Sequence, residues 1–364
     1  MRVLIGGGGT GGHIYPALAL ARYALTEDSM TEILFVGTAR GLENKIVPSS
    51  GFNLAIIPAR GFQRNSKQLS LAIKDNWGGL ERSRRIISDF KPDIVLGTGG
   101  YVAFPLVMAA IIKHCPVVIH EQNALPGLTN RWLAPLVNRV CLSFFETRKK
   151  LSRLSRIQFT GNPRASEVHS VGRAEGCRYF GLAPEQKNIL IYGGSRGSLK
   201  INQVVTEYLK ANLVPEGVNL IYVTGDDYYQ TVRGALGQIP DNVKLFPYLE
   251  EMPMALAAAD LAVTRSGATT LAEVTALGVP VLLIPSPNVV NNHQYHNARL
   301  LSDAGAAVLI DEKELDHTRL QTEINRLLSD PILLDEMSRQ SKAMGVPDAA
   351  RRLYQCMQAV ISEH

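Results

Sequence analysis

The sequence of 364 residues lacks most features of exported, disulfide-bonded and membrane-spanning proteins. Its 4 cysteines show no CxxC spacing, which argues against both a disulfide framework and a structural zinc site. The longest nearly apolar run extends from Tyr101 to Ile112 and contains Pro105, whereas a helix that spans a bilayer needs roughly 20 residues. No secretory signal follows Met1. We therefore expect a chain that stays in a reducing cytoplasm and touches membranes only peripherally.

Charge of one sign is not in large excess either. Lys and Arg number 38 against 33 Asp and Glu, a net charge of +5, and this excess is too diffuse to indicate nucleic acid as a partner. Apolar residues make up 46% of the chain, which is enough for two packed cores. Since one core seldom serves so many residues, we expect two domains.

Short β-branched segments bounded by glycine alternate with amphipathic segments along the chain, a pattern typical of parallel sheets covered by helices. In the first half, strands are predicted at residues 2–5, 33–36, 93–96, 117–120 and 139–142. In the second half, strands are predicted at residues 188–192, 219–224, 243–246, 261–264, 281–284 and 307–309.

The turn Gly161-Asn162-Pro163 separates the two series of strands. We therefore expect an N-terminal domain at residues 1–160, a second domain at residues 161–345, and a helical C-terminal segment at residues 346–364. This last segment could pack anywhere, including back on the first domain.

The first predicted strand runs directly into a glycine-rich loop that ends at His13. Glycines let the backbone approach an anion, and the start of the following helix favours negative charge by about 0.3–2 kcal/mol. A GxGxxG pattern at Gly7, Gly9 and Gly12 also fits a dinucleotide-binding dehydrogenase. That alternative requires an acidic residue after the second strand, but residues 37–40 read Gly-Thr-Ala-Arg, which argues against it.

Two further glycine turns follow predicted strands, from Gly97 to Tyr101 and from Gly193 to Ser198. Any one of these turns could serve only to close a tight connection between strand and helix. Three of them at strand ends indicate a ligand, because ligands of open α/β sheets bind at the carboxyl ends of the strands.

Six blocks of the sequence resemble, in order and over nearly the whole chain, the motifs of the MurG family of peptidoglycan glycosyltransferases. The blocks are Gly8 to His13 with Pro16-Ala17, Gly97 to Val102, His120-Glu121-Gln122-Asn123, Gly161-Asn162-Pro163-Arg164, Gly193-Gly194-Ser195, and Arg265-Ser266-Gly267-Ala268 through Glu273. The resemblance implies the GT-B architecture, an α/β fold in which two Rossmann-like domains with parallel sheets face each other across a cleft.

The same resemblance implies a reaction. N-acetylglucosamine would pass from UDP-N-acetylglucosamine to the C4 hydroxyl of the N-acetylmuramic acid unit of lipid I, an undecaprenyl-diphosphate acceptor, and so form lipid II. The transfer would invert the anomeric centre and need neither a metal ion nor a cofactor. Charge that grows on the diphosphate would instead meet backbone N–H groups of the glycine turns.

The acceptor hydroxyl must lose a proton in such a transfer, which is work for a general base. His13 is the candidate, because the positive end of the helix that follows the loop disfavours the imidazolium form. The alternative is that His13 only hydrogen-bonds the substrate or closes the loop.

The resemblance assigns the donor mainly to the C-terminal domain. Glu273 would accept hydrogen bonds from the ribose, Ser195 would meet the diphosphate, the backbone of Leu249 would pair with uracil, and Gln294 would read the sugar hydroxyls. Simpler alternatives are a solvated carboxylate for Glu273 and a loop-capping amide for Gln294. The other expected donor-side residues are Thr10, Gly11, Gly12, Asn123, Arg164, Ala268, Thr269, Thr270 and Leu271.

The acceptor is expected on the N-terminal domain, with Gly99, Gly100, Tyr101 and Glu121 as candidate contacts. Tyr101 and Glu121 could equally be scaffold. Apolar and basic side chains are interleaved between residues 63 and 91, which is typical of a helix that meets anionic lipid headgroups. The expected membrane contacts are Leu71, Lys74, Trp77, Leu80, Arg82, Arg84 and Arg85.

An ordinary half-buried helix with a solvated basic face remains the alternative for this stretch. With a membrane contact, the expected location is the cytoplasmic face of the cell membrane, where other cell-wall synthesis proteins would be possible partners. Two rival functions also stay open, namely another GT-B enzyme, such as a UDP-sugar 2-epimerase or a transferase with a different acceptor, and a non-catalytic UDP-sugar-binding protein. The presence of His13, Glu273 and Gln294 argues against a degenerate site.

Overall fold

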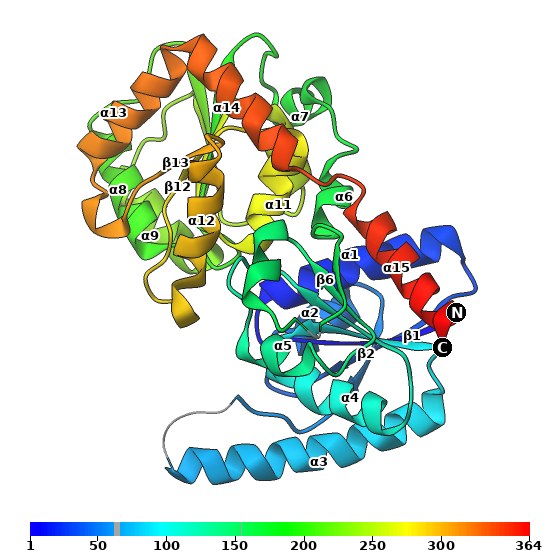
Figure 1. Cartoon of the computed structure of the whole chain (residues 1–364). Helices are drawn as coiled ribbons and strands as arrows, with labels where there is room; N and C mark the ends of the chain where they lie inside the picture. The colour runs from blue at the N-terminus through cyan, green and yellow to red at the C-terminus, as the bar shows by residue number, and fades with distance from the viewer. Residues whose placement is uncertain (62–65, 154) are drawn as a thin grey trace. The chain divides into compact units, whose positions relative to one another are not determined.

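The computed structural model describes residues 1–61, 66–153 and 155–364, and the chain divides into two compact units (Figure 1). Unit 1 comprises Met1–Arg164 and Asp348–His364, and unit 2 comprises Ala165–Pro347. The chain therefore passes from one unit to the other twice, and its last helix belongs to the unit in which the chain begins. Residues 63–65, at the start of the predicted basic apolar stretch, lie outside the described residues.

Unit 1 alternates strands and helices. Its elements are β1 (Arg2–Gly7), α1 (Gly11–Glu27), β2 (Glu32–Gly37), α2 (Glu43–Ser49), β3 (Asn53–Ile56), α3 (Ser66–Phe90), β4 (Ile94–Gly99), α4 (Gly100–Ile112), β5 (Val117–Glu121), α5 (Leu128–Leu133), β6 (Arg139–Leu142), the 3-10 helix η1 (Phe145–Lys150), β7 (Ile157–Phe159) and α15 (Ala349–Glu363). The short helix α6 (Arg164–Val168) begins at the last residue of the first segment of unit 1.

The sheet of unit 1 has seven parallel strands in the order β3-β2-β1-β4-β5-β6-β7. Its strand side chains alternate between two cores. Val3 and Ile5 of β1 pack with α1 and α15, whereas Leu4 packs with α3 and α4 on the other face. Since both faces are covered, the central strands are almost wholly apolar, which is the signal that predicted them.

Unit 2 repeats this plan. Its elements are α7 (Arg173–Phe180), β8 (Lys187–Tyr192), α8 (Leu199–Lys210), β9 (Val218–Val223), α9 (Asp226–Leu236), β10 (Val243–Phe246), α10 (Met252–Ala258), β11 (Leu261–Thr264), α11 (Ala268–Leu277), β12 (Val281–Leu283), η2 (Val290–Asn292), α12 (His293–Asp303), β13 (Ala307–Leu309), η3 (Glu312–Glu314), α13 (His317–Leu328) and α14 (Pro331–Met344). The parallel sheet has the order β10-β9-β8-β11-β12-β13.

All the strands predicted from the sequence are present, and the predicted α/β fold with two parallel sheets is confirmed. Two strands were missed, β3 and β7, and they are the two edges of the sheet of unit 1. Within the described ranges, no helix combines the length and the apolar character that a membrane crossing requires.

Candidate active site

The strand orders place the glycine turns at one point in each sheet. In unit 1, β1 lies between β2 and β4, so the chain leaves β1 and β4 toward helices at adjacent positions. In unit 2, β8 lies between β9 and β11, which brings the turn at Gly193 next to the turn at Ser266. Such switch points at the carboxyl ends of strands are where open α/β sheets bind ligands.

A buried carboxylate that the sequence did not reveal holds the first glycine loop. Glu43, the first residue of α2, is 0% exposed. One carboxylate oxygen of Glu43 accepts hydrogen bonds from the backbone N–H and the hydroxyl of Thr38, at 2.9 and 2.8 Å. The other carboxylate oxygen accepts a hydrogen bond from the N–H of Gly9 at 3.0 Å. The backbone N–H of Gly9 in the first loop is therefore bonded to a side chain of the protein and is not available to a ligand.

The glycines around Glu43 follow from this arrangement. A Cβ at Gly8, Gly37 or Gly41 would lie within 2.7 Å of an atom of the Glu43 side chain. The available signal was an acidic residue shortly after β2, preceded by Gly37 and Gly41. A ribose-binding acid was expected directly after the strand, within residues 37–40, whereas Glu43 lies beyond Arg40.

His13 lies between the first and second glycine turns. Its carbonyl accepts a hydrogen bond from the hydroxyl of Thr98 at 2.9 Å. Gly99 and Gly100 have φ values of 105° and 77°, and a Cβ on Gly99 would stand 2.9 Å from the His13 ring. The packing of His13 and a positive φ therefore both require glycine at Gly99, whereas at Gly100 a Cβ would clash with the carbonyl oxygen of Gly8.

Within the described part of the chain, the His13 ring makes one side-chain hydrogen bond. Its Nδ1 lies 3.0 Å from Oε1 of Gln122, and Nε2 of Gln122 lies 2.8 Å from the carbonyl oxygen of Thr98 and 3.0 Å from Nδ1 of His120. Nε2 of His120 lies 2.9 Å from the carbonyl oxygen of Gly161. Burial lowers the pKa of His120 to about 4, so this ring is neutral near pH 7.

The structure favours scaffold over acceptor contact for Glu121. The side chain is buried, and its oxygens accept hydrogen bonds from the N–H groups of Asn123 and Gly127 and from Nδ2 of Asn130, at 2.8 to 3.0 Å. This network fixes the loop that carries Asn123.

Tyr101 packs its ring against Gly9, which has a φ of 83°, and so lies over the first loop.

Four of the expected donor-side residues, Thr10, Gly11, Gly12 and Arg164, lie in unit 1. Thr10 caps α1 in an extended conformation without a side-chain hydrogen bond, and Gly11 and Gly12 form the first turn of the helix. The guanidinium of Arg164 lies 5.8 Å from the centre of the Tyr15 ring, within the range of a cation–π contact.

In unit 2, the turn after β8 is exposed at Ser195, and Gly194 and Gly197 have φ values of 87° and 72°. Ser198 caps α8, and its hydroxyl also accepts a hydrogen bond from Arg265 at 2.6 Å. Arg265 donates to the carbonyl oxygen of Ile284 and pairs with Glu312. The arginine thus ties the turn after β8 to those after β11 and β12.

Helix α11 carries five of the expected donor-side residues. Ala268, Leu271 and Glu273 are buried, and Thr269 has a buried hydroxyl oxygen with no hydrogen-bond partner among the described residues. Such an orphaned group is typical of a site that takes a polar ligand. Burial and the charge of Glu273 raise the pKa of the Tyr192 phenol well above its ordinary value.

Gln294 is the second residue of α12, and Leu249 lies on the loop between β10 and α10. Oε1 of Gln294 accepts the N–H of Ser286 at 2.8 Å, which is the loop-capping role, and this leaves the NH₂ group of the amide for another partner. Leu249 follows β10 and is 8% exposed, so its buried side chain fixes the loop backbone.

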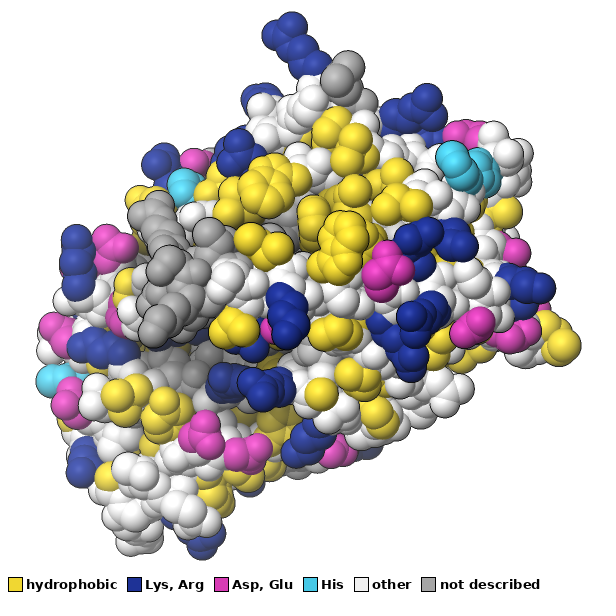
Figure 2. Space-filling view, turned by 90° about the horizontal axis from the view of Figure 1, so that it is seen from below, with side chains coloured by type: hydrophobic (Ala, Val, Ile, Leu, Met, Phe, Trp, Pro, Cys, Tyr) yellow, Lys and Arg dark blue, Asp and Glu magenta, His cyan; other side chains and the backbone are white. Residues whose placement is uncertain are grey.

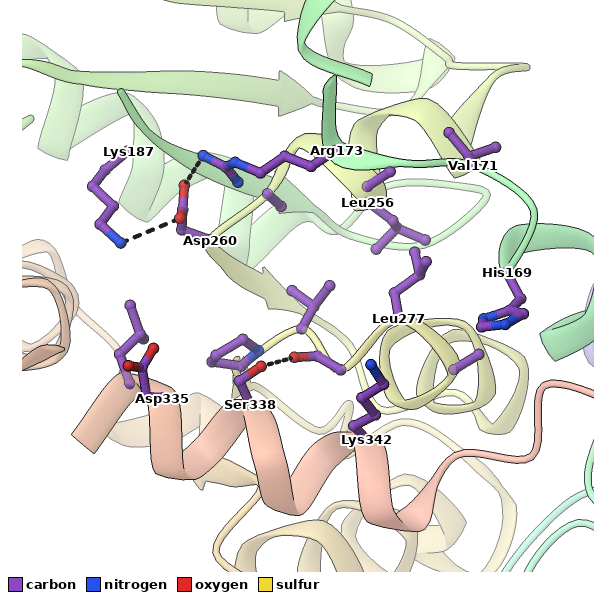
Figure 3. Close-up of a pocket in the computed structure, with 17 residues that line it drawn as sticks. His169, Val171, Arg173, Lys187, Leu256, Asp260, Leu277, Asp335, Ser338 and Lys342 are labelled. Atoms are coloured by element: carbon purple, nitrogen blue, oxygen red, sulfur yellow. Dashed lines mark hydrogen bonds and ion pairs between the residues drawn. The ribbon is translucent and has the colours of Figure 1, made fainter. Parts of the chain in front are cut away.

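A pocket of about 380 Å³ lies at the opposite end of the sheet of unit 2 (Figure 3). Its lining includes the residues that precede or begin β8, β11 and β12, namely Lys187, Asp260 and Pro280. Asp260 pairs there with Arg173 at 2.9 Å and with Lys187 at 3.3 Å. Because the glycine turns lie at the carboxyl ends of the same strands, this pocket is separate from the candidate donor site.

An apolar surface ringed by basic side chains covers the side of unit 1 that is built from α3, α4 and α5 (Figure 2). Among the exposed apolar residues of these elements, Leu71, Ile73 and Trp77 lie on α3, Ile112 ends α4, Leu128 and Trp132 lie on α5, and Leu136 follows α5. Trp77 is 68% exposed and Trp132 is 57% exposed. Of the predicted contacts, Lys74, Arg82 and Arg85 are exposed, Leu80 packs partly against the core, and Arg84 pairs with Glu81 at 3.0 Å.

Comparisons with known proteins agree with these features over the whole chain. Residues 3–142 match the N-terminal domain of glycosyltransferase family 28, and residues 188–353 match its C-terminal domain. The chain is 44% identical to the "UDP-N-acetylglucosamine--N-acetylmuramyl-(pentapeptide) pyrophosphoryl-undecaprenol N-acetylglucosamine transferase" of Acetivibrio thermocellus, over 99% of this chain and 98% of that protein. The protein of the same name from Caldanaerobacter subterraneus is 44% identical over 99% of this chain and 100% of its own length.

A crystal structure of MurG from Acinetobacter baumannii superposes with a TM-score of 0.78 at 29% identity, and covers 98% of this chain and 99% of that one. The chain belongs to the MurG family. Membership of MurG confirms the resemblance found in the sequence and excludes the dehydrogenase alternative. A UDP-GlcNAc 2-epimerase from Neisseria meningitidis has a TM-score of 0.67 but only 16% identity, and so shares the fold alone with this chain.

Proposed function

We propose that this MurG family member transfers N-acetylglucosamine from UDP-N-acetylglucosamine to the C4 hydroxyl of the N-acetylmuramic acid unit of lipid I and forms lipid II. The observation that carries the proposal is the full-length identity of 44% with transferases named for this reaction. The glycine turns at both switch points and the position of His13 between two of them support it.

In the proposed mechanism, His13 takes the proton of the acceptor hydroxyl. The oxygen of that hydroxyl bonds to the anomeric carbon on the face opposite UDP. The bond from that carbon to the diphosphate breaks, UDP leaves, and the anomeric centre is inverted. The turn at Ser195 and the start of α11 offer backbone N–H groups to the charge that grows on UDP. The reaction in this form needs neither a metal ion nor a cofactor.

Incubation of the purified protein with UDP-N-acetylglucosamine and a lipid I analogue tests the proposal. We expect a disaccharide product with inverted anomeric configuration, formed equally well in the presence of EDTA. A UDP-sugar epimer formed without acceptor would instead identify an epimerase. Binding of UDP without turnover of either kind would identify a binding protein.

Glu273 is proposed to accept hydrogen bonds from the ribose hydroxyls of the donor. Replacing Glu273 with Ala is expected to raise KM for UDP-N-acetylglucosamine about 10- to 100-fold, because a hydrogen bond to a charged group is worth about 1.5–3 kcal/mol. Steady-state kinetics with saturating acceptor measure this change. Thr275→Val is the matched control, since Thr275 is equally buried on α11 and the hydrogen bonds of its hydroxyl to described residues go to carbonyl oxygens of the same helix. An unchanged KM in the Glu273 variant would assign Glu273 to a structural role.

The apolar surface of unit 1 is proposed to bind the anionic cytoplasmic face of the cell membrane peripherally. Trp77 and Trp132 suit the interfacial region of a bilayer, and the exposed Lys74, Arg82 and Arg85 suit its headgroups. A lipid-linked acceptor would be encountered at such a surface. Other cell-wall synthesis proteins are further proposed partners.

Changing Lys74, Arg82 and Arg85 together to Glu is expected to lower partitioning onto anionic vesicles at least about a hundredfold, because each basic side chain near such a surface contributes about 1 kcal/mol. Sedimentation with vesicles rich in phosphatidylglycerol at low and high salt measures the effect. A triple change of Arg178, Lys200 and Lys210 to Glu in unit 2 alters the net charge equally and serves as the control. Equal losses in both variants would contradict a specific membrane surface on α3.

A further inference from the structure

The hydrogen bonds of Gln122 and His120 determine which nitrogen of His13 carries hydrogen. Two backbone carbonyl oxygens stand at the ends of this network, and a carbonyl can only accept. The oxygen of Gly161 lies 2.9 Å from Nε2 of His120, so that nitrogen must donate. Since the ring is fully buried and neutral, its Nδ1 carries no hydrogen and accepts.

The orientation of the Gln122 amide follows from its neighbours. The carbonyl oxygen of Thr98, at 2.8 Å, and the lone pair on Nδ1 of His120, at 3.0 Å, both require a donor. The amide NH₂ must therefore face these two groups, and a third contact of the same nitrogen, to the carbonyl oxygen of His120 at 3.1 Å, is again to an acceptor. The amide oxygen is left to face His13.

The oxygen of Gln122 lies 3.0 Å from Nδ1 of His13 and cannot donate. Nδ1 of His13 must then carry the hydrogen, and in the neutral ring the lone pair lies on Nε2. No hydrogen bond from the described residues reaches Nε2 of His13. We infer that Gln122 and His120 are positioning residues that hold His13 in the tautomer whose Nε2 takes the proton of the acceptor hydroxyl.

This inference rests on the proposed function, since it concerns the proton that the transfer releases. The network works against the preference of a free imidazole, which in water carries its hydrogen mainly on Nε2. Without it, the larger share of neutral His13 would have no lone pair at Nε2. Gln122 and His120 are buried and touch neither the hydroxyl nor the sugar in this scheme, so they act only through His13.

Long-range ¹H–¹⁵N correlation spectra of the protein with ring-labelled histidine test the tautomer directly, and the His13 signals are assigned by their loss in His13→Ala. We expect the pattern of a ring protonated at Nδ1 in the wild type. Gln122→Met is expected to move His13 toward protonation at Nε2 and to lower kcat about 10- to 100-fold, with KM for the donor nearly unchanged. Gln122→Glu keeps an acceptor oxygen toward His13, although it loses the NH₂ group that faces Thr98 and His120, and is expected to preserve the Nδ1 tautomer.

Ile119→Val is the control for stability, because it removes a methyl group from the core at β5, the strand that ends directly before Gln122. A wild-type His13 protonated at Nε2 would overturn the inference, as would a Gln122→Met variant that keeps wild-type kcat. Equal losses of kcat in Gln122→Met and Ile119→Val would reduce Gln122 to a structural role. If the wild type transfers no sugar, the proposed function fails, while the spectrum still decides the tautomer.

Discussion

Replacing His13 with Ala is expected to lower kcat by about 10²–10⁴, the range that a general base contributes. UDP affinity is expected to stay near the wild-type value, because the residues proposed to contact the ribose, the diphosphate and uracil, namely Glu273, Ser195 and Leu249, lie in unit 2. Rapid-quench or steady-state assays with the lipid I analogue give kcat, and calorimetric titration with UDP gives the affinity. Both measurements are needed, since a general collapse of the site would lower them together.

A second variant separates a base from a simple hydrogen-bond donor. His13→Asn places an amide NH₂ near the position of Nδ1, where it can still donate to Oε1 of Gln122. The asparagine side chain of this variant has no group that takes a proton at neutral pH. We expect His13→Asn to be as inactive as His13→Ala, and substantial activity in the Asn variant would show that His13 only closes the loop or orients the substrate.

Replacing Glu43 with Ala is expected to lower the free energy of unfolding of unit 1 by about 3 kcal/mol or more. The change leaves the N–H groups of Gly9 and Thr38 and the Thr38 hydroxyl without their acceptor, and each orphaned buried donor costs about 1–3 kcal/mol. The first glycine loop would lose the anchor at Gly9, so we also expect kcat to fall. Denaturant unfolding followed by circular dichroism, together with the transfer assay, measures both effects.

Glu32→Ala is the matched control for this experiment, because Glu32 begins β2 and is exposed. Its replacement is expected to change stability by no more than about 0.5 kcal/mol. Glu43→Gln keeps the volume and one acceptor oxygen and is expected to fall between the wild type and the Ala variant. A loss in Glu43→Ala no larger than that in Glu32→Ala would contradict the anchoring role.

The central strands were predictable because burial on both faces makes them continuous apolar runs. The edge strands β3 and β7 were not, since Asn53–Ile56 and Ile157–Phe159 are short and half exposed, and their partners are set by the sheet rather than by their own sequence. The glycine-rich loop was expected to extend to His13, but α1 begins at Gly11; its first two residues are glycines, which disfavour a helix and hid its start.

Candidate site residues were predictable where the glycine turns mark them and less so where tertiary contacts define them. His13 stood out beside its turn, whereas Glu43 and Gln122 depend on donors and acceptors that come from other strands. On α3, alternation of apolar and basic residues indicated the helix but not which side chains it buries. Leu80 packs against the core, and Arg84 forms an ion pair with Glu81. Trp132 was not predicted, because α5 is too short to show a helical period in the sequence.

The return of the chain to unit 1 has a consequence for its synthesis on the ribosome. Helix α15 packs against α1, and its buried Leu353, Tyr354, Met357 and Val360 belong to the same core as Val3 and Ile5. Vectorial folding usually completes the N-terminal domain first, but here unit 2 has all its residues before the last helix of unit 1 is translated. The half of the protein that bears His13 is thus the last to close, and a nascent or prematurely terminated chain would present an uncovered apolar face to chaperones and proteases.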